Sequence, residues 1–262
     1  MSKIREKIIE VNNRNEKALT IFLTAGFPSV EKFVELALKI EQAGADILEI
    51  GLPFGDSLAD GPVIQLSYTV ALKNNVNLLT TFELVSELRK QSQIPIVIMS
   101  SSNPVLAFGK KKFVQNCQDA KVDGIIIPDI PLEEYDDFYK NDFIGIDKIL
   151  LTTPTSSEKR ISTIDEKSSG FVYCVSVVGT TGVREKFDDY VLRNLERTYS
   201  IVKINKMQIG FGISTPEDVK KFSPFCDGVI VGSAIVKSLA NDDDKFSKTI
   251  ELVKELKRAT KS

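Results

Sequence analysis

Histidine is absent from the 262 residues, and this absence excludes more chemistry than any other feature of the composition. Without an imidazole the chain cannot form a Ser-His-Asp or Cys-His nucleophile system, a His-ligated metal site or the usual proton shuttle at neutral pH. Acid–base chemistry must then come from carboxylates, lysine, tyrosine or cysteine. We also expect no metal site.

Cysteine is scarce, with Cys117, Cys174 and Cys226 as the only members and no CxxC spacing among them. An odd number of widely spaced cysteines predicts neither a disulfide framework nor a zinc site. All three lie in or near apolar runs, so we expect buried thiols in a reducing compartment.

Long hydrophobic runs and an excess of one charge are also missing. The N-terminal stretch MSKIREKIIEVNNRNEK is charged throughout, and no later segment holds 18 uncharged apolar residues in a row, so we expect a soluble, cytoplasmic protein. The 34 basic and 36 acidic residues leave a net charge of −2, which indicates no nucleic acid and no acidic membrane as partner. A small molecule or another protein is the expected partner.

Short β-type runs alternate with helical patterns along nearly the whole chain, which is typical of βαβ units around a parallel sheet. The length suits one core, so we expect a single domain over residues 1–262. We predict an α/β fold, a (β/α)₈ TIM barrel, with an extra N-terminal helix over residues 2–14 that covers the barrel floor. An open doubly wound sheet is the competing fold, although it usually has fewer strands. The expected strands are residues 18–26, 46–51, 94–100, 124–129, 147–152, 171–176, 207–212 and 227–232.

The run EIGLPFGDSLADGP places three acids close together, at the end of the second strand and in the loop that follows. The period of two puts Glu49 on the face of Ile47, which points inward in a closed barrel, at the strand end where barrel enzymes carry out catalysis. A buried, unpaired carboxylate raises its own pKa and suits proton transfer. An outward-facing or ion-paired Glu49 is the alternative. Asp56 and Asp60 have the equally good alternative of forming turns with their own backbone.

Two glycine clusters follow the seventh and eighth strands, GFGISTPEDV at 210–219 and GVIVGSAIVKS at 228–238. Barrels commonly hold phosphate in these two loops, beside a helix N-terminus. Either cluster alone is explained by tight turns, but the pair favours a phosphate site. The loop VVGTTGVREKF after the sixth strand is long enough to close over a ligand, and an ordinary surface loop is the alternative.

With these segments in order, the sequence resembles the tryptophan synthase alpha subunit family over essentially its whole length. The matching motifs are LTAGFPS, EIGLPFGDSLADGPVIQ, SNP, PDIPLEE, GTTG, GFGISTPEDV and GSAIV. The resemblance implies retro-aldol cleavage of indole-3-glycerol phosphate to indole and glyceraldehyde 3-phosphate in tryptophan biosynthesis. It also implies that this chain has no cofactor and passes indole to a beta subunit that carries pyridoxal phosphate, in an alpha2beta2 complex.

The resemblance further assigns roles to individual residues. It implies that Glu49 is the catalytic acid–base, that Asp60 contacts the indole N–H, and that Asp56 couples the chain to its partner. Thr181 would bond the catalytic aspartate when the site closes. The substrate-binding residues implied in this way are Phe22, Ile64, Tyr173, Thr181, Gly182, Phe211, Gly212, Gly232 and Ser233.

The chain departs from the family pattern at a few positions. Ser101 and Ser102 stand where the family often has tyrosine, which predicts a looser wall of the indole pocket, and Val177 replaces a common arginine near the GTTG loop. Gly55 and Ser57 replace the usual serine and proline around Asp56, so we expect a more flexible loop.

Three other functions remain open at this point. The chain could be an isomerase or synthase of another phosphate-binding barrel family, against which the EIGLPFGDSLADGP run argues. It could be a catalytically weak subunit that activates its partner, or a lyase that acts alone. Incubation of the purified chain with indole-3-glycerol phosphate, followed by detection of indole, would separate most of these functions.

Overall fold

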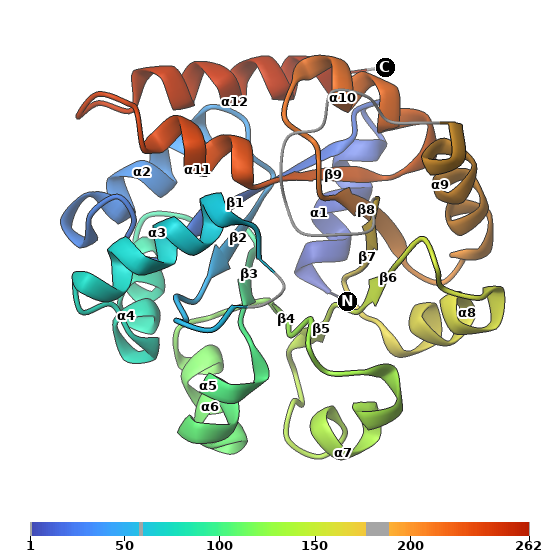
Figure 1. The fold of residues 1–262 in the computed structure, drawn as a ribbon, viewed down its shortest axis with the longest axis horizontal. Helices are drawn as coiled ribbons and strands as arrows, with labels where there is room; N and C mark the ends of the chain where they lie inside the picture. The colour runs from blue at the N-terminus through green and yellow to red at the C-terminus, as the bar shows by residue number, and fades with distance from the viewer. Residues whose placement is uncertain (1, 58–59, 177–188, 262) are drawn as a thin grey trace.

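The computed structural model describes residues 2–57, 60–176 and 189–261. Thr181, Gly182 and Val177 therefore lie outside the described residues. Parallel strands form a ring with helices around it, as Figure 1 shows. The strands are β1 (Ala18–Thr24), β2 (Ile47–Gly51), β3 (Ile96–Met99), β4 (Gly124–Ile126), β5 (Asp147–Lys148), β6 (Leu151–Thr152), β7 (Phe171–Val175), β8 (Lys206–Gly210) and β9 (Gly228–Val231).

The nine strands correspond to the eight predicted segments because the fifth segment is divided in two. Its first half, β5, pairs with β4, and its second half, β6, pairs with β7. Between the halves, Ile149 N–H donates to the Ile125 carbonyl at 3.0 Å, while Leu150 C=O accepts from Tyr173 N–H at 3.0 Å. One segment thus borders both ends of the strand order β4-β3-β2-β1-β9-β8-β7 and closes the ring. The predicted TIM barrel is confirmed.

The helices pack their apolar stripes against the outside of this ring. In α2, Phe33, Leu36, Ala37 and Ile40 are buried on one face, as the three- and four-residue spacing predicts. The helix ends before Gly44, whose φ of +116° only glycine adopts readily. The helices are α1 (Lys3–Asn12), α2 (Val30–Gln42), α3 (Pro62–Lys73), α4 (Leu78–Arg89), α5 (Ser102–Phe108), α6 (Lys110–Asp119), η1 (Leu132–Glu134), α7 (Tyr135–Tyr139), α8 (Glu158–Lys167), α9 (Asp189–Ile201), α10 (Pro216–Phe222), η2 (Ser223–Phe225), α11 (Ser233–Leu239) and α12 (Ser247–Ala259).

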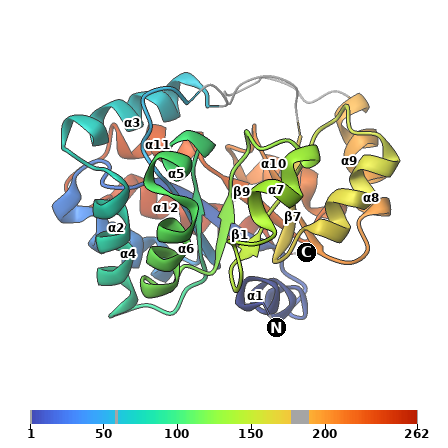
Figure 2. The ribbon, with the colours of Figure 1, turned by 90° about the horizontal axis from the view of Figure 1, so that it is seen from below.

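The extra N-terminal helix, α1, covers the end of the barrel at which the strands begin, as predicted (Figure 2). Its apolar side chains Ile4, Ile8 and Val11 are fully buried. Contact with the sheet is close, because a Cβ on Gly124 at the start of β4 would lie 2.7 Å from Ile4 Cδ1. Burial of three large aliphatic side chains contributes roughly 1.5–3 kcal/mol each to stability.

The cysteines are buried free thiols, as the sequence predicts: Cys117, Cys174 and Cys226 form no disulfide with any described residue. Across the described ranges, none of the helices combines the length and the apolar character that a membrane crossing requires.

Candidate active site

Glu49 faces the interior of the barrel near the carboxyl end of β2. Its neighbours across the sheet are Phe22 on β1 and Val97 on β3, and only 2% of its surface is exposed. Within the described part of the chain, its Oε2 atom has no hydrogen-bond partner, and no cation lies within ion-pair distance of the carboxylate. The alternatives of an outward-facing or ion-paired Glu49 are therefore wrong. The Oε2 atom has thus lost water without gaining a partner among the described residues.

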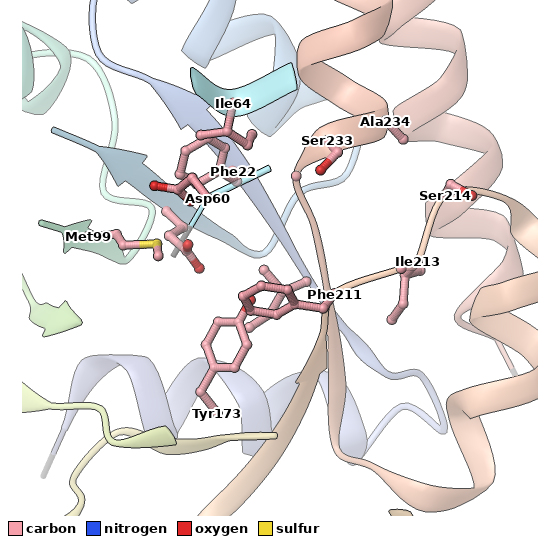
Figure 3. A pocket seen from close by; sticks show the side chains of 14 residues that line it. Phe22, Asp60, Ile64, Met99, Tyr173, Phe211, Ile213, Ser214, Ser233 and Ala234 are labelled. Carbon is pink, nitrogen blue, oxygen red and sulfur yellow. The ribbon is translucent and has the colours of Figure 1, made fainter. Parts of the chain in front are cut away.

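Asp60 comes to the same place from the loop after β2, and it is 8% exposed. The loop is tied to the start of α3, because the Gln65 side-chain amide donates to the carbonyls of Ser57 at 3.2 Å and Asp60 at 2.9 Å. Figure 3 shows the Asp60 carboxylate beside Phe22 and close to Met99. Asp56, four residues earlier, is exposed. The two loop acids thus occupy different environments.

Burial sets the protonation of the two buried acids. Desolvation, and then the charge of Asp60, raise the pKa of Glu49 to about 8. Desolvation also raises the pKa of Asp60, to about 6, although a hydrogen bond with Ser57 opposes the shift. At neutral pH the pair therefore favours a protonated Glu49 beside an ionised Asp60, since two adjacent carboxylates do not readily ionise together. Such a division gives one proton donor and one fixed anion.

Glu49 and Asp60 line a cavity with mostly apolar walls. The rings of Tyr173 and Phe211 form one wall, with centroids 5.9 Å apart and planes at 71° (Figure 3). Phe22, Ile64, Met99 and Ile230 supply further apolar contacts. Apolar and aromatic walls of this kind suit a flat aromatic ligand.

Glycine at position 210 makes room for the Tyr173 side chain. A Cβ atom there would lie 2.1 Å from the Tyr173 hydroxyl oxygen, a separation that no real contact shows. Tyr173 could not keep its place against any side chain at this position.

The backbone after β8 adopts an uncommon conformation at the cavity wall. Phe211 has a φ of +71° and Gly212 a φ of +78°, and the first value is rare for a side chain of this size. The Ser176 hydroxyl donates to the Phe211 carbonyl, which helps to hold this turn. Strained backbone of this kind concentrates at functional sites, and here it aims the Phe211 ring at the cavity.

The far end of the cavity is lined by the two glycine-containing turns that the sequence predicts for phosphate. At α10 the first turn is already occupied, because the Asp218 carboxylate accepts from the N–H groups of Ser214 and Thr215, both at 2.9 Å. At α11, Gly232 is the N-cap residue and no side chain caps the helix. The uncapped N–H groups of α11 are therefore the better anion donors.

The cavity brings together most of the predicted site residues. Those that line it are Phe22, Glu49, Asp60, Ile64, Tyr173, Phe211, Gly212, Gly232 and Ser233, whereas Thr181 and Gly182 lie outside the described residues. The sequence reasoning missed Met99, Ile213, Ser214, Ile230 and Ala234. Strand alternation could have found Ile230, which lies two residues before Gly232 and therefore on the same face.

A second cavity, of about 590 Å³, adjoins the first and shares Asp60 and Met99 with it. The serines at 100 and 101 line this second cavity, as does Asp56. Ser102 does not line it, and its N–H and hydroxyl both donate to the Asp129 carboxylate. Ser101 thus lines the second cavity and not the first, so a looser wall of the indole pocket stays a prediction.

The raised pKa of Glu49 has a consequence for stability. Between its ordinary value near 4.5 and about 8, the folded chain keeps a proton that the unfolded chain releases, so the free energy of unfolding falls as pH rises. Glu49→Gln removes this loss. We expect the difference in free energy of unfolding, variant minus wild type, to increase by roughly 2 kcal/mol from pH 5 to pH 7, since one pKa unit corresponds to about 1.4 kcal/mol. Urea unfolding at both pH values measures the difference, and parallel pH profiles would contradict a buried, protonated Glu49.

Comparisons with known proteins agree with this geometry. The family model for the tryptophan synthase alpha chain matches residues 8–262. The tryptophan synthase alpha chain of Petrotoga mobilis is 41% identical over 264 residues, covering 100% of this chain and 98% of the relative. That of Thermoanaerobacter pseudethanolicus is 42% identical over 258 residues, covering 98% and 96%.

Solved structures give the same result. A tryptophan synthase structure from Mycobacterium tuberculosis has a TM-score of 0.89 at 28% identity, covering 100% of this chain and 99% of the other. The alpha chain from Legionella pneumophila also has a TM-score of 0.89, at 29% identity, with 99% and 97% covered. This chain belongs to the tryptophan synthase alpha chain family and is a lyase.

Proposed function

We propose that Glu49 and Asp60 carry out the retro-aldol cleavage of indole-3-glycerol phosphate in the cavity between β2 and β8. One observation supports this most strongly: two buried carboxylates with raised pKa values face one apolar cavity, at whose other end lies an uncapped helix start. The cavity thus offers a proton donor, an anion, walls that can bind a ring, and backbone N–H groups that can donate hydrogen bonds to a phosphate.

The residue chemistry accounts for each step. Protonated Glu49 gives its proton to indole C3, and Asp60 stabilises the positive charge that develops at the ring N–H. The Glu49 carboxylate so formed takes the proton of the hydroxyl on the adjacent side-chain carbon. As that oxygen becomes an aldehyde, the bond from its carbon to C3 breaks, and the bonding electrons return to the ring. The products are indole and glyceraldehyde 3-phosphate, and Glu49 ends protonated again.

The other site residues hold the substrate in the proposed pose. Phe22, Ile64, Tyr173 and Phe211 contact the ring or the apolar portion, while Gly212, Gly232 and Ser233 present backbone N–H groups to the phosphate. A Cβ at position 232 would lie 3.4 Å from Phe22 Cβ, which is ordinary contact, so the protein itself does not require glycine there. Thr181 and Gly182 belong to the same proposal through the family resemblance.

A larger side chain at position 232 is expected to weaken phosphate binding selectively. Gly232→Val fills the space beside the α11 N–H groups, and the KM for indole-3-glycerol phosphate should rise at least ~10-fold, because about 1.4 kcal/mol of binding is lost. Binding of free indole, measured by calorimetry, should change far less. Inorganic phosphate should compete with substrate in the wild type and poorly in the variant. An equal loss for both ligands would argue against phosphate at this turn.

The partner in this proposal is the tryptophan synthase beta subunit, in an alpha2beta2 complex in the cytoplasm. Pyridoxal phosphate would be bound by that subunit and no cofactor by this chain, which we propose is a single domain over 1–262. The Mycobacterium tuberculosis relative is described as a tryptophan synthase, and the exposed Asp56 beside the second cavity provides a contact point.

Release of indole from indole-3-glycerol phosphate by the purified chain, with and without beta subunit, tests the proposal. A rate that is measurable alone and rises with the partner is expected. A high rate that ignores the partner would favour a lyase acting alone, and no indole under either condition would favour an activating subunit without catalysis.

A further inference from the structure

A groove at the opposite end of the barrel has the features of a second anion site. It lies beside α1, between the end of α9, the start of β8 and η2. The groove is open to solvent, and its empty space, solvent included, is about 1120 Å³. Figure 2 shows α1 at this end, away from α3. We propose that this groove binds a small organic phosphate that carries a planar ring, as a nucleoside monophosphate does.

Two cations face the groove, and neither forms an ion pair with a carboxylate in the described part of the chain. Arg5 projects from α1, and its Nε atom is buried with no hydrogen-bond partner. Lys203, in the turn after α9, is exposed and forms no ion pair with any described residue. A phosphate oxygen would accept from the guanidinium N–H groups of Arg5 that face the groove and from the Lys203 ammonium.

The other charges at the groove do not cancel these two cations. Asp227 is already engaged, since it accepts from Lys206 Nζ at 3.0 Å and from the Met207 N–H at 2.9 Å. Glu196 is exposed on α9. Asp165 lies behind the Lys203 turn and is engaged by three backbone N–H groups. Among the described residues that line the groove, Arg5 and Lys203 are therefore the cations left to meet a bound anion.

The Lys203 turn is held in place before any ligand arrives. The Asp165 carboxylate accepts from the backbone N–H groups of Lys203 at 2.6 Å, Ile204 at 2.8 Å and Asn205 at 2.9 Å. Three bonds to one buried carboxylate restrict the turn, and a preorganised turn loses little conformational entropy on binding.

Aromatic side chains give the groove its preference for a ring. Tyr199 from α9 and Phe225 from η2 are half-buried and line the groove, with the exposed Pro224 beside them. A planar ring gains dispersion and stacking contacts with such side chains, and Arg5 can pair with a phosphate through its fork of N–H groups. A ring and a phosphate on one molecule match both features.

Isothermal calorimetry with adenosine 5′-monophosphate, adenosine and inorganic phosphate tests the proposal on the full chain. Adenosine 5′-monophosphate should bind at least ~10-fold more tightly than either fragment. Arg5→Gln and Lys203→Gln should each weaken it at least ~10-fold. Lys159→Gln, an exposed lysine on α8 that does not line the groove, is the matched control and should leave binding unchanged. Thermal unfolding confirms that each variant is folded.

A parallel measurement on Gly232→Val separates this groove from the phosphate end of the active site. Binding of adenosine 5′-monophosphate should survive in that variant. If Gly232→Val loses nucleotide binding while Arg5→Gln retains it, the nucleotide binds in the active site and the proposal is wrong. The proposal is also wrong if the wild type binds no nucleotide at about 10 mM, which is 10-fold above a millimolar Kd. Equal affinity for inorganic phosphate would overturn the ring preference. None of these readouts depends on the cleavage reaction.

Discussion

Glu49→Gln is expected to lower the turnover of indole-3-glycerol phosphate by ~10²–10⁴-fold, the usual cost of losing one general acid–base group. Glutamine keeps the shape of the buried side chain and removes its titrating proton. Because the walls of the cavity and the start of α11 are untouched, substrate affinity should change little. Steady-state release of indole measures the rate, and calorimetry on the inactive variant measures the affinity.

Asp147→Asn is a suitable control for this experiment. Asp147 is also partly buried, and desolvation also raises its pKa, but it lies in β5 and contacts Ser2 and Ser169 at the other end of the barrel. Turnover in this variant should match the wild type. Substantial residual cleavage by Glu49→Gln, at a level near that of the control, would assign proton transfer to another residue.

The fold could be predicted because its signal is periodic and local. Alternating apolar residues mark each strand, and the three- and four-residue spacing marks α2 over almost its full length. The division of the fifth strand was not predictable in this way, because DKILLT is one continuous apolar-containing run. Its two halves separate only through the barrel geometry, which pairs Asp147–Lys148 with β4 and Leu151–Thr152 with β7.

Some site residues could likewise be predicted from the sequence, and others could not. Glu49 could be found because a charge on an apolar strand face is anomalous by itself. Asp60 and Asp56 could not be told apart from local sequence, since both stand near glycine in one loop, yet the first is 8% exposed and the second is exposed. The positive φ of Phe211 leaves no mark in the sequence, because glycine is the residue that usually signals it.

The loop between β2 and α3 connects the molecular surface to the buried acids over a few residues. Asp56 is exposed and lines the second cavity, whereas Asp60 lines both cavities. The Gln65 side-chain amide on α3 donates to the carbonyls of Ser57 and Asp60. Among the described residues, apart from its chain neighbours, none has an atom within 4 Å of the position that a Cβ on Gly55 would take, so this side of the loop has room around it. We propose that a partner that contacts Asp56 acts on Asp60 through this loop.

Addition of saturating beta subunit is expected to raise indole release by this chain ~5–150-fold, which corresponds to a coupling of roughly 1–3 kcal/mol. The partner can produce this rise only if it binds the productive loop position more tightly than the others. Asp56→Ala should remove most of the activation and leave the slow rate of the free chain nearly unchanged, because Asp56 is assigned to coupling and not to proton transfer. Glu166→Ala, an exposed acid on α8, should retain full activation. The test compares six rates of indole release, for the wild type and the two variants, each with and without beta subunit. If Asp56→Ala is activated as strongly as Glu166→Ala, the loop does not carry the coupling, and if the free wild-type chain is already fast, the site is productive without its partner.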